Sequence, residues 1–192
     1  RLLTQIFSWV IFWFVLAGQA MADPLSDAQQ AYAAGNYAKA LDLYSPLAKK
    51  GDAKAQLSLG VMYYIGQGAT QSYKDAAKWF QRAAEQGNVL AQDILGEMHD
   101  QGLGVPQDYR KAAKLYRLAA EQGDAHAQYN LGLMYARELG VPQDYVRAYM
   151  WMSLSAKFPE ELVMVAKQMS SSQIAKAQEL AAQCSAKQFK GC

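Results

Sequence analysis

The chain has 192 residues, with 19 Lys and Arg against 17 Asp and Glu and a formal net charge of +2. This near balance argues against a nucleic-acid-binding protein, because such proteins usually carry a clustered basic face. It does not indicate a strongly acidic partner either.

The first 22 residues predict a secretory signal peptide. Arg1 is the only charged residue of this segment, and the run from Ile6 to Ala17 is almost wholly apolar. Ala20 and Ala22 place small residues at both positions that cleavage requires, so we expect cleavage after Ala22 and a periplasmic or secreted mature chain with no membrane span. An uncleaved membrane anchor is the alternative, although about a dozen apolar residues are fewer than the roughly twenty that a span needs.

From about residue 28 onward, the sequence repeats with a period of thirty-six residues. A fixed period in this range predicts a repeat architecture. The positions that recur are tyrosines, alanines and glutamine–glycine pairs: Tyr37, Tyr73, Tyr109 and Tyr145; Ala40, Ala76, Ala112 and Ala148; Gln56/Gly60, Gln92/Gly96 and Gln128/Gly132.

Each repeat is expected to form two helices, because capping residues recur at two places in it. The N-cap candidates of the first helix are Asp52, Asn88 and Asp124. This helix is expected to end at Gly66 in one repeat and at Gly102 in the next. The second helix has N-cap candidates in Asn36, Ser72, Asp108 and Asp144, and its predicted buried stripe in one copy is Tyr73, Ala76, Ala77, Phe80, Ala83 and Ala84. Neither helix can bury its apolar stripe alone, so neighbouring pairs must stack.

These segments resemble the Sel1-like repeat (SLR) family, a relative of the tetratricopeptide (TPR) helix pairs. The first helix and its loop match in AQLSLGVMYYIGQG (55–68), AQDILGEMHDQGLG (91–104) and AQYNLGLMYARELG (127–140), and the second helix in KDAAKWFQRAAEQG (74–87) and RKAAKLYRLAAEQG (110–123). The resemblance implies an all-α, right-handed α/α solenoid over residues 23–159, with repeats at about 28–51, 52–87, 88–123 and 124–159. It also implies a binding scaffold, although the fold does not name a partner.

The third full repeat departs from this pattern. Glu138 replaces the first loop glycine, so we expect its turn to be built differently from those of the other repeats. Phe158-Pro159 replaces the terminal glycine and ends the repetition. Residues 160–192 are expected to form capping helices and a tail, with one helix near 160–169 and a second that starts at a capping box in Ser170–Gln173.

Cys184 and Cys192 both lie in the C-terminal tail. In an oxidising compartment they could form a disulfide that fixes the tail to the last helix. Two free thiols are the alternative. A metal site at these cysteines is not expected, because CxxC spacing and a nearby histidine are both absent.

The sequence contains no recognisable catalytic motif. G-x-S-x-G, S-x-x-K, H-E-x-x-H and G-x-x-x-x-G-K are all absent. His99 occupies the repeat position of Tyr63 and Tyr135, so it is expected to pack between helices. Glu97 and Asp100 share a helix face from which His99 points about a third of a turn away, which argues against a metal site. We therefore predict a protein without enzymatic activity, metal or cofactor.

In TPR solenoids the first helix of each pair lines a concave groove, and the resemblance implies that this groove is the partner-binding site. From the first full repeat to the third, the groove would be apolar, then acidic, and then aromatic with one cation. Such a surface would suit a peptide with a hydrophobic anchor near a Lys or Arg. Ordinary surface positions are the alternative, and Leu57, Val61 and Ile65 could instead pack on the opening unit. The residues carried over are Lys54, Leu57, Val61, Tyr64 and Ile65, then Leu90, Asp93, Glu97, Asp100 and Gln101, then His126, Tyr129, Leu133 and Arg137.

Two functional hypotheses follow. The first is a secreted or periplasmic scaffold that binds a protein or peptide through this groove. The second is a cell-wall-ligand-binding protein or hydrolase that resembles the cysteine-rich SLR proteins and uses His99 with its neighbouring acids. The chain lacks the dense cysteine pairs of those proteins, which favours the scaffold.

Overall fold

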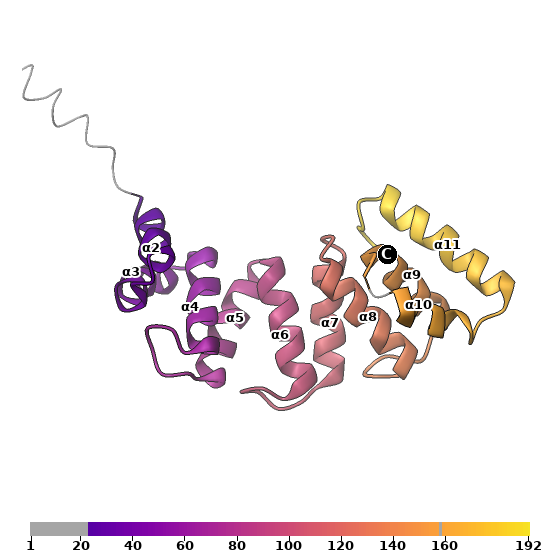
Figure 1. Cartoon of the computed structure of the whole chain (residues 1–192), viewed down its shortest axis with the longest axis horizontal. Helices are drawn as coiled ribbons and strands as arrows, with labels where there is room; N and C mark the ends of the chain where they lie inside the picture. Colours follow the sequence, from indigo (N-terminus) through magenta and orange to yellow (C-terminus); the bar gives the residue numbers. More distant parts are fainter. Residues whose placement is uncertain (1–22, 158) are drawn as a thin grey trace, which may run out of the picture.

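The computed structural model describes residues 23–157 and 159–192, and the predicted signal peptide and Phe158 lie outside these ranges. The described residues form helices and no strands, as the all-α prediction requires. Successive helices follow one another along a curved array in chain order (Figure 1). From α2 to α10 each helix packs mainly on the helices next to it in the chain, which is the arrangement of a solenoid.

The array consists of an opening pair, three full repeats and two closing helices. The opening pair is α2 (Pro24–Ala33) and α3 (Tyr37–Lys49). The full repeats are α4 (Ala53–Ile65) with α5 (Tyr73–Glu85), α6 (Val89–Gln101) with α7 (Tyr109–Ala120), and α8 (Ala125–Arg137) with α9 (Tyr145–Ser155). The closing helices are α10 (Pro159–Ala166) and α11 (Ser171–Ala186).

The predicted N-caps are confirmed in both helices of the repeats. In each case the cap side chain accepts a hydrogen bond from the backbone N–H three residues later, which satisfies one of the free amides of the first turn. The caps of the first helices are Asp52, Asn88 and Asp124, and those of the second are Asn36, Ser72, Asp108 and Asp144.

The turn at Glu138 contradicts the sequence-based expectation. Glu138 adopts φ 59° and ψ 34°, close to φ 77° and ψ 35° at Gly66 and φ 73° and ψ 29° at Gly102. The turn is therefore built in the same way as in the other repeats. A Cβ at Gly102 would come no closer than 3.4 Å to another residue, so a larger side chain fits there and only the left-handed backbone opposes it.

The second glycine of the loop has a stricter role. Gly104 has φ +70°, and a Cβ on it would lie 2.3 Å from the carbonyl carbon of Tyr73. A Cβ on Gly140 would likewise lie 2.3 Å from the carbonyl carbon of Tyr109. The loop of one repeat therefore packs against the first backbone units of the second helix in the preceding repeat, where no side chain fits.

The core is built from alanines of both helices together with larger apolar side chains, such as Leu59 and Met62 of α4. The predicted stripe is buried at its alanines and at Phe80, whereas Tyr73 is only half-buried and its counterpart Tyr109 is 36% exposed. Phe80 lies over Gly60 and Tyr116 lies over Gly96 in the next repeat, where an added Cβ would come within 2.5 Å and 2.9 Å of the ring. Glycine at these helix positions lets the two helices of a repeat pack closely.

Buried glutamines join successive repeats, a role that the sequence did not reveal. Gln92 donates a hydrogen bond of 3.2 Å to the carbonyl of Ala84 at the end of the preceding helix. The side-chain oxygen of Gln92 accepts one of 2.8 Å from Gln122. Gln56 makes the equivalent pair with Ala48 and Gln86, so each junction satisfies the amide that it buries.

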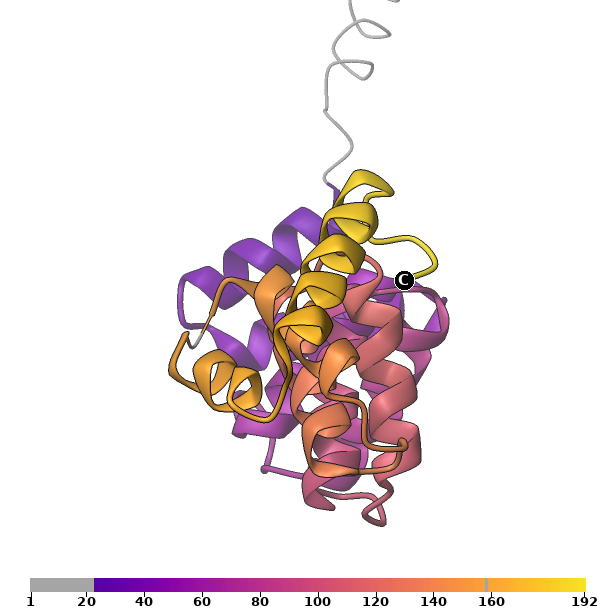
Figure 2. The same cartoon turned by 90° about the vertical axis from the view of Figure 1, so that its right-hand side faces the viewer.

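The C-terminal helices cover the end of the array. α10 ends at Ala166, a few residues earlier than expected, and α11 begins at the predicted capping box of Ser170 and Gln173. α11 packs on α9 and lies across the end of the array (Figure 2). Cys184 and Cys192 form a disulfide that holds the tail against this helix. Among residues 23–157 and 159–192, no helix has the length and apolar character that crossing a membrane requires.

Candidate functional site

The predicted groove residues divide into two groups in the structure. We call the face formed by the half-buried side chains of α4, α6 and α8, together with the exposed Arg137, the first-helix face. Its members are Leu57, Val61 and Tyr64 from α4, Asp93, Glu97 and Asp100 from α6, and Tyr129, Leu133 and Arg137 from α8. The other predicted residues project further into solvent: Lys54, Ile65, Leu90, Gln101 and His126.

Three carboxylates form the middle of the first-helix face. Asp93, Glu97 and Asp100 are four and three residues apart, so they share one side of α6. Burial and, after it, Glu97 raise the pKa of Tyr64 on α4, and burial raises the pKa of Asp100 while Arg137 on α8 opposes this rise. The first-helix face therefore draws its charged and aromatic groups from three successive repeats.

Asp93 is the most perturbed of the three acids. Its pKa is raised to about 7, mainly by burial and also by the nearby carboxylates of Asp124 and Glu97, while Lys157 opposes them. The Oδ1 atom of Asp93 is buried and has no hydrogen-bond partner among the described residues. An unpaired buried oxygen of this kind is costly, because it has lost the water that would otherwise donate to it.

Glu97 differs from Asp93 in having a donor. The side-chain amide of Gln101 donates a hydrogen bond of 2.9 Å to Glu97 Oε1 from the next turn of α6. Burial raises the pKa of Asp100 above its ordinary value. The three carboxylates therefore differ in how well the protein itself satisfies them.

Tyr116 belongs to this site, although the sequence did not identify it. It is 2% exposed, its ring lies over Gly96 of α6, and its pKa is raised by burial and by Asp100, Asp93 and Glu97. Within the described ranges its hydroxyl has no hydrogen-bond partner. A signal was present in the sequence, since the equivalent residue of the preceding repeat is Phe80.

Apolar side chains flank the acids on both sides. Leu57, Val61 and Tyr64 pack against the core of α5 and α6, so they face the following repeat instead of the opening unit. Ile65 is 47% exposed and does not share this packing.

On the other side of the acids, Tyr129 and Leu133 pack against the C-terminal core. Tyr129 lies beside Glu161 of α10, which together with burial raises the pKa of Tyr129. Leu133 and Arg137 help to line a hollow of about 160 Å³ that α10 borders through Met164.

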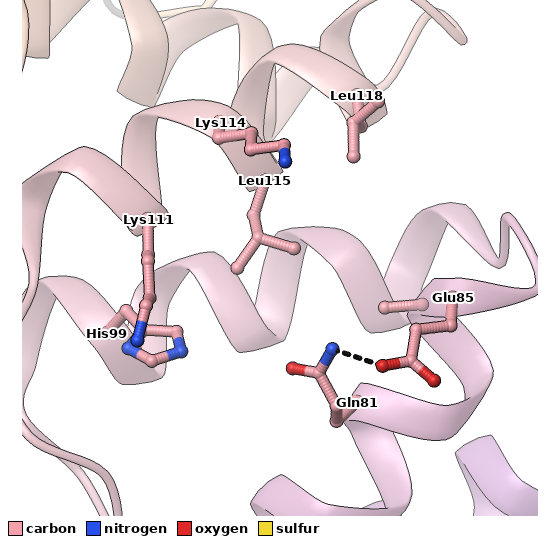
Figure 3. Close-up of a pocket in the computed structure, with 8 residues that line it drawn as sticks. Gln81, Glu85, His99, Lys111, Lys114, Leu115 and Leu118 are labelled. Carbon is pink, nitrogen blue, oxygen red and sulfur yellow. Dashed lines mark hydrogen bonds between the residues drawn. The ribbon is translucent and has the colours of Figure 1, made fainter.

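His99 lies apart from the three carboxylates. It is 8% exposed, and its Nδ1 is 3.4 Å from the carbonyl of Pro106, so the expected packing between helices is confirmed. It borders a hollow of about 450 Å³ between α5 and α7, next to Lys111 and Leu115 (Figure 3). Gln81 donates a hydrogen bond to Glu85 at the other side of this hollow.

None of Asp93, Glu97 and Asp100 lines the hollow beside His99. The histidine and the acids that a hydrolase would combine are therefore not brought together. In the part of the chain that the structure describes, no group of three His, Cys, Asp or Glu side chains is placed to hold a metal ion.

Comparison with known proteins identifies the fold family. The Sel1 repeat model matches residues 27–52, 53–88, 89–124 and 125–157. The crystal structure of c5321, a protective antigen of uropathogenic Escherichia coli strains that displays an SLR fold, is 38% identical with a TM-score of 0.67, over 75% of this chain and 32% of that one. A Sel1 repeat protein from Oxalobacter formigenes is 27% identical with a TM-score of 0.64, over 96% of this chain and 75% of that one. No curated protein matches the chain. The chain spans about a third of the length of the Escherichia coli antigen, and it belongs to the Sel1 repeat family.

Proposed function

We propose that this protein is a non-enzymatic scaffold of the periplasm or the extracellular space, and that it binds a protein or peptide segment in a concave groove formed by α4, α6 and α8. Sel1 repeats typically mediate protein–protein interactions. The observation that carries the proposal is the first-helix face, where three carboxylates lie between apolar side chains from the two adjacent repeats.

The chemistry of this face favours a peptide over a small molecule. Leu57 and Val61 on one side and Leu133 on the other are only partly covered, so an apolar side chain placed on them would lose water-exposed area. The acids between them would favour a cationic group and disfavour an anionic one. A segment with apolar residues on both sides of a basic residue would contact both apolar regions and the acids between them.

Two features support the proposed compartment. The disulfide between Cys184 and Cys192 persists in oxidising environments such as the periplasm and the extracellular space. The apolar segment before Asp23, with expected cleavage after Ala22, would direct the chain there.

The alternative function, a cell-wall-ligand-binding protein or hydrolase, gains no support from the site. It would use His99 together with Glu97 and Asp100, and the structure places His99 beside Lys111 on a different surface. We therefore keep the scaffold as the single proposal. An activity lost on His99→Ala alone would overturn this choice.

Capture of partners from envelope extract tests the proposal. The bait is residues 23–192, compared with a variant that carries Asp93→Lys, Glu97→Lys and Asp100→Lys. Because reversal of half-buried acids can unfold a helix, far-UV circular dichroism must first show that the helical content is retained.

A matched control reverses three exposed acids elsewhere, namely Asp42→Lys, Glu85→Lys and Glu179→Lys, with the same change in net charge. A partner captured by the native chain and this control, and lost from the first variant, is the expected result. A partner that all three chains retain would show that the binding surface lies elsewhere.

A further inference from the structure

The hollow of about 450 Å³ beside His99 lies between the second helices of the first full repeat and the middle repeat, and we call it the second-helix hollow. Leu115 and Leu118 of α7 border it on one side. Gln81 and Glu85 of α5 border it on the other (Figure 3). Leu118 is 41% exposed, so the hollow is open to solvent. Its volume lies in the range of about 300–1,000 Å³ that is usual for ligand sites.

Smaller side chains at this junction account for the open space. Leu115 stands at the repeat position that tryptophan occupies in both neighbouring repeats, as Trp79 and Trp151. Trp79 packs against the core of α2, α3 and α4, and Trp151 is 2% exposed. In the same way, His99 replaces the larger Tyr135 of the next repeat, which is also 2% exposed. The middle repeat therefore lacks the indole that both of its neighbours carry at this position.

The polar side chains of the hollow also differ from their counterparts at the next junction. There, Arg117 of α7 donates a hydrogen bond to the hydroxyl of Tyr135 and so connects two repeats. Gln81 stands at the position equivalent to Arg117, but it donates a hydrogen bond of 2.7 Å to Glu85 on its own helix. The side chain of Gln81 therefore stays on α5 and leaves the space between the two helices open (Figure 3).

Two lysines give the α7 side of the hollow a positive charge. Lys111 and Lys114 both line it, one turn apart. At the equivalent positions of α5, Asp75 and Lys78 form an ion pair of 2.8 Å. A second lysine replaces the acid in α7, and Lys114 makes no ion pair within residues 23–157 and 159–192, whereas Lys111 pairs with Asp108 at 3.6 Å. Lys114 is therefore the cation that an anionic group of a ligand would meet.

We propose that the second-helix hollow binds a tryptophan side chain of a peptide segment in which an acidic residue adjoins the tryptophan. The indole lies on Leu115 and Leu118, in the space that the missing indole leaves, and its burial removes apolar area from water. The carboxylate lies beside Lys114, across the hollow from Glu85, which would repel it. Because the hollow is open and its lysines are exposed, a segment that crosses it can place both groups at once.

This site is separate from the groove of the proposed function. The residues that line the second-helix hollow include none of the first-helix face. The inference therefore goes beyond the proposed function and does not depend on it.

Peptides that differ at one residue test the inference. The probes are acetylated and amidated heptapeptides of glycine and serine with a central tryptophan–aspartate, tryptophan–asparagine or leucine–aspartate pair. Binding to isotope-labelled residues 23–192 is followed by NMR titration, which gives the affinity and locates the site. We expect chemical-shift changes around the hollow, in α5, α7 and the end of α6.

We expect the tryptophan–aspartate peptide to bind about tenfold more tightly than the leucine–aspartate peptide, because the indole buries more apolar area. The tryptophan–asparagine peptide should bind about two- to fivefold more weakly than the first, as for a partly exposed ion pair. Leu115→Trp should abolish binding without loss of fold, because tryptophan already occupies this position in both neighbouring repeats. Lys114→Glu should abolish the preference for aspartate over asparagine. The matched change Lys78→Glu, at the equivalent position of α5, should leave this preference intact.

Equal affinities of the tryptophan–aspartate and leucine–aspartate peptides would overturn the inference, as would binding that survives in a folded Leu115→Trp chain. If Leu115→Trp does not fold, a preference for aspartate that persists in Lys114→Glu overturns it. The absence of binding by every peptide, or chemical-shift changes confined to the first-helix face, would overturn it too. The envelope capture judges the proposed function separately, since its groove variant changes no residue of the hollow.

Discussion

Replacing Gly104 by alanine should destabilise the array far more than the same change two residues earlier. Gly104 has φ +70°, and an added Cβ would lie 2.3 Å from the carbonyl carbon of Tyr73 and 2.6 Å from the amide nitrogen of Lys74. These are backbone atoms at the start of α5, and they cannot rotate away as a flexible side chain would. The loop would have to separate from α5.

The expected magnitude has two parts. A left-handed backbone costs an alanine about 1–2 kcal/mol, and overpacking against fixed atoms costs about 1–3 kcal/mol more. At Gly102 only the first part applies, because φ is +73° and the nearest atom is 3.4 Å away. We therefore expect Gly104→Ala to lower the free energy of unfolding by about 3 kcal/mol and Gly102→Ala by about 1 kcal/mol.

Equilibrium urea denaturation followed by far-UV circular dichroism measures both variants. The reverse change, Glu138→Gly, should stabilise the chain by about 1 kcal/mol, since it relieves a left-handed residue without a new contact. Equal destabilisation by Gly104→Ala and Gly102→Ala would refute the reasoning, because the contact between loop and preceding helix would then contribute nothing.

Further predictions concern the middle repeat and the tail. Gly96→Leu should lower the melting temperature markedly, because even a Cβ would lie 2.9 Å from the ring of Tyr116, and an unchanged melting temperature would contradict this packing. Asp93 has a folded pKa of about 7 against an ordinary 3.8, so its ionisation withdraws stability between about pH 4 and pH 7. Asp93→Asn should therefore stabilise the chain at pH 8 by about 1–2 kcal/mol, a value reduced for solvent screening, and should have little effect near pH 4. Urea titrations at the two pH values test this, and equal effects at both would contradict it. Reduction of the Cys184–Cys192 disulfide should destabilise the closing helix by about 2–3 kcal/mol, seen as faster hydrogen exchange in α11 than in α6, and equal exchange before and after reduction would exclude such a role.

The helix pairs could be predicted because their signals are local. An N-cap such as Asp52 needs only its own side chain and the amide of Ala55 three residues later. The alanine stripe follows from helix periodicity, which a single helix fixes by itself. The period of thirty-six residues then required that successive pairs stack, so the architecture followed without any knowledge of individual contacts.

The misjudged positions depend on contacts between repeats. Glu138 was expected to change its turn, because a left-handed residue favours glycine, but the space around that position admits a side chain. The neighbouring loop glycine, Gly140, is the restricted one, and its restriction comes from the backbone of Tyr109 thirty-one residues earlier. A pattern within one repeat cannot distinguish these two glycines.

The acids of the candidate site were predicted through their repeat positions, whereas Tyr116 was not. As one member of the buried stripe, Tyr116 looks equivalent to Phe80, since both fill the same space over a glycine. Its relation to the acids follows only from the packing of its ring over Gly96 of α6, the helix that carries Asp93, Glu97 and Asp100. This relation joins a second helix to a first helix, so the pattern of either helix alone could not show it.

In each full repeat one side chain of the second helix packs over a glycine of the first helix, and comparing these three side chains shows what packing alone requires. Phe80, Tyr116 and Met152 all fill the space, so a hydroxyl is not needed to close a repeat. A buried carboxylate oxygen without a hydrogen-bond partner lowers stability. The middle repeat carries this cost at Asp93 Oδ1, and no other buried side-chain nitrogen or oxygen of residues 23–157 and 159–192 lacks a partner. Leu57 and Tyr129 stand at the equivalent positions of the neighbouring repeats, so the fold does not need a carboxylate there. The presence of Asp93 at this cost agrees with the binding role that we propose for the first-helix face.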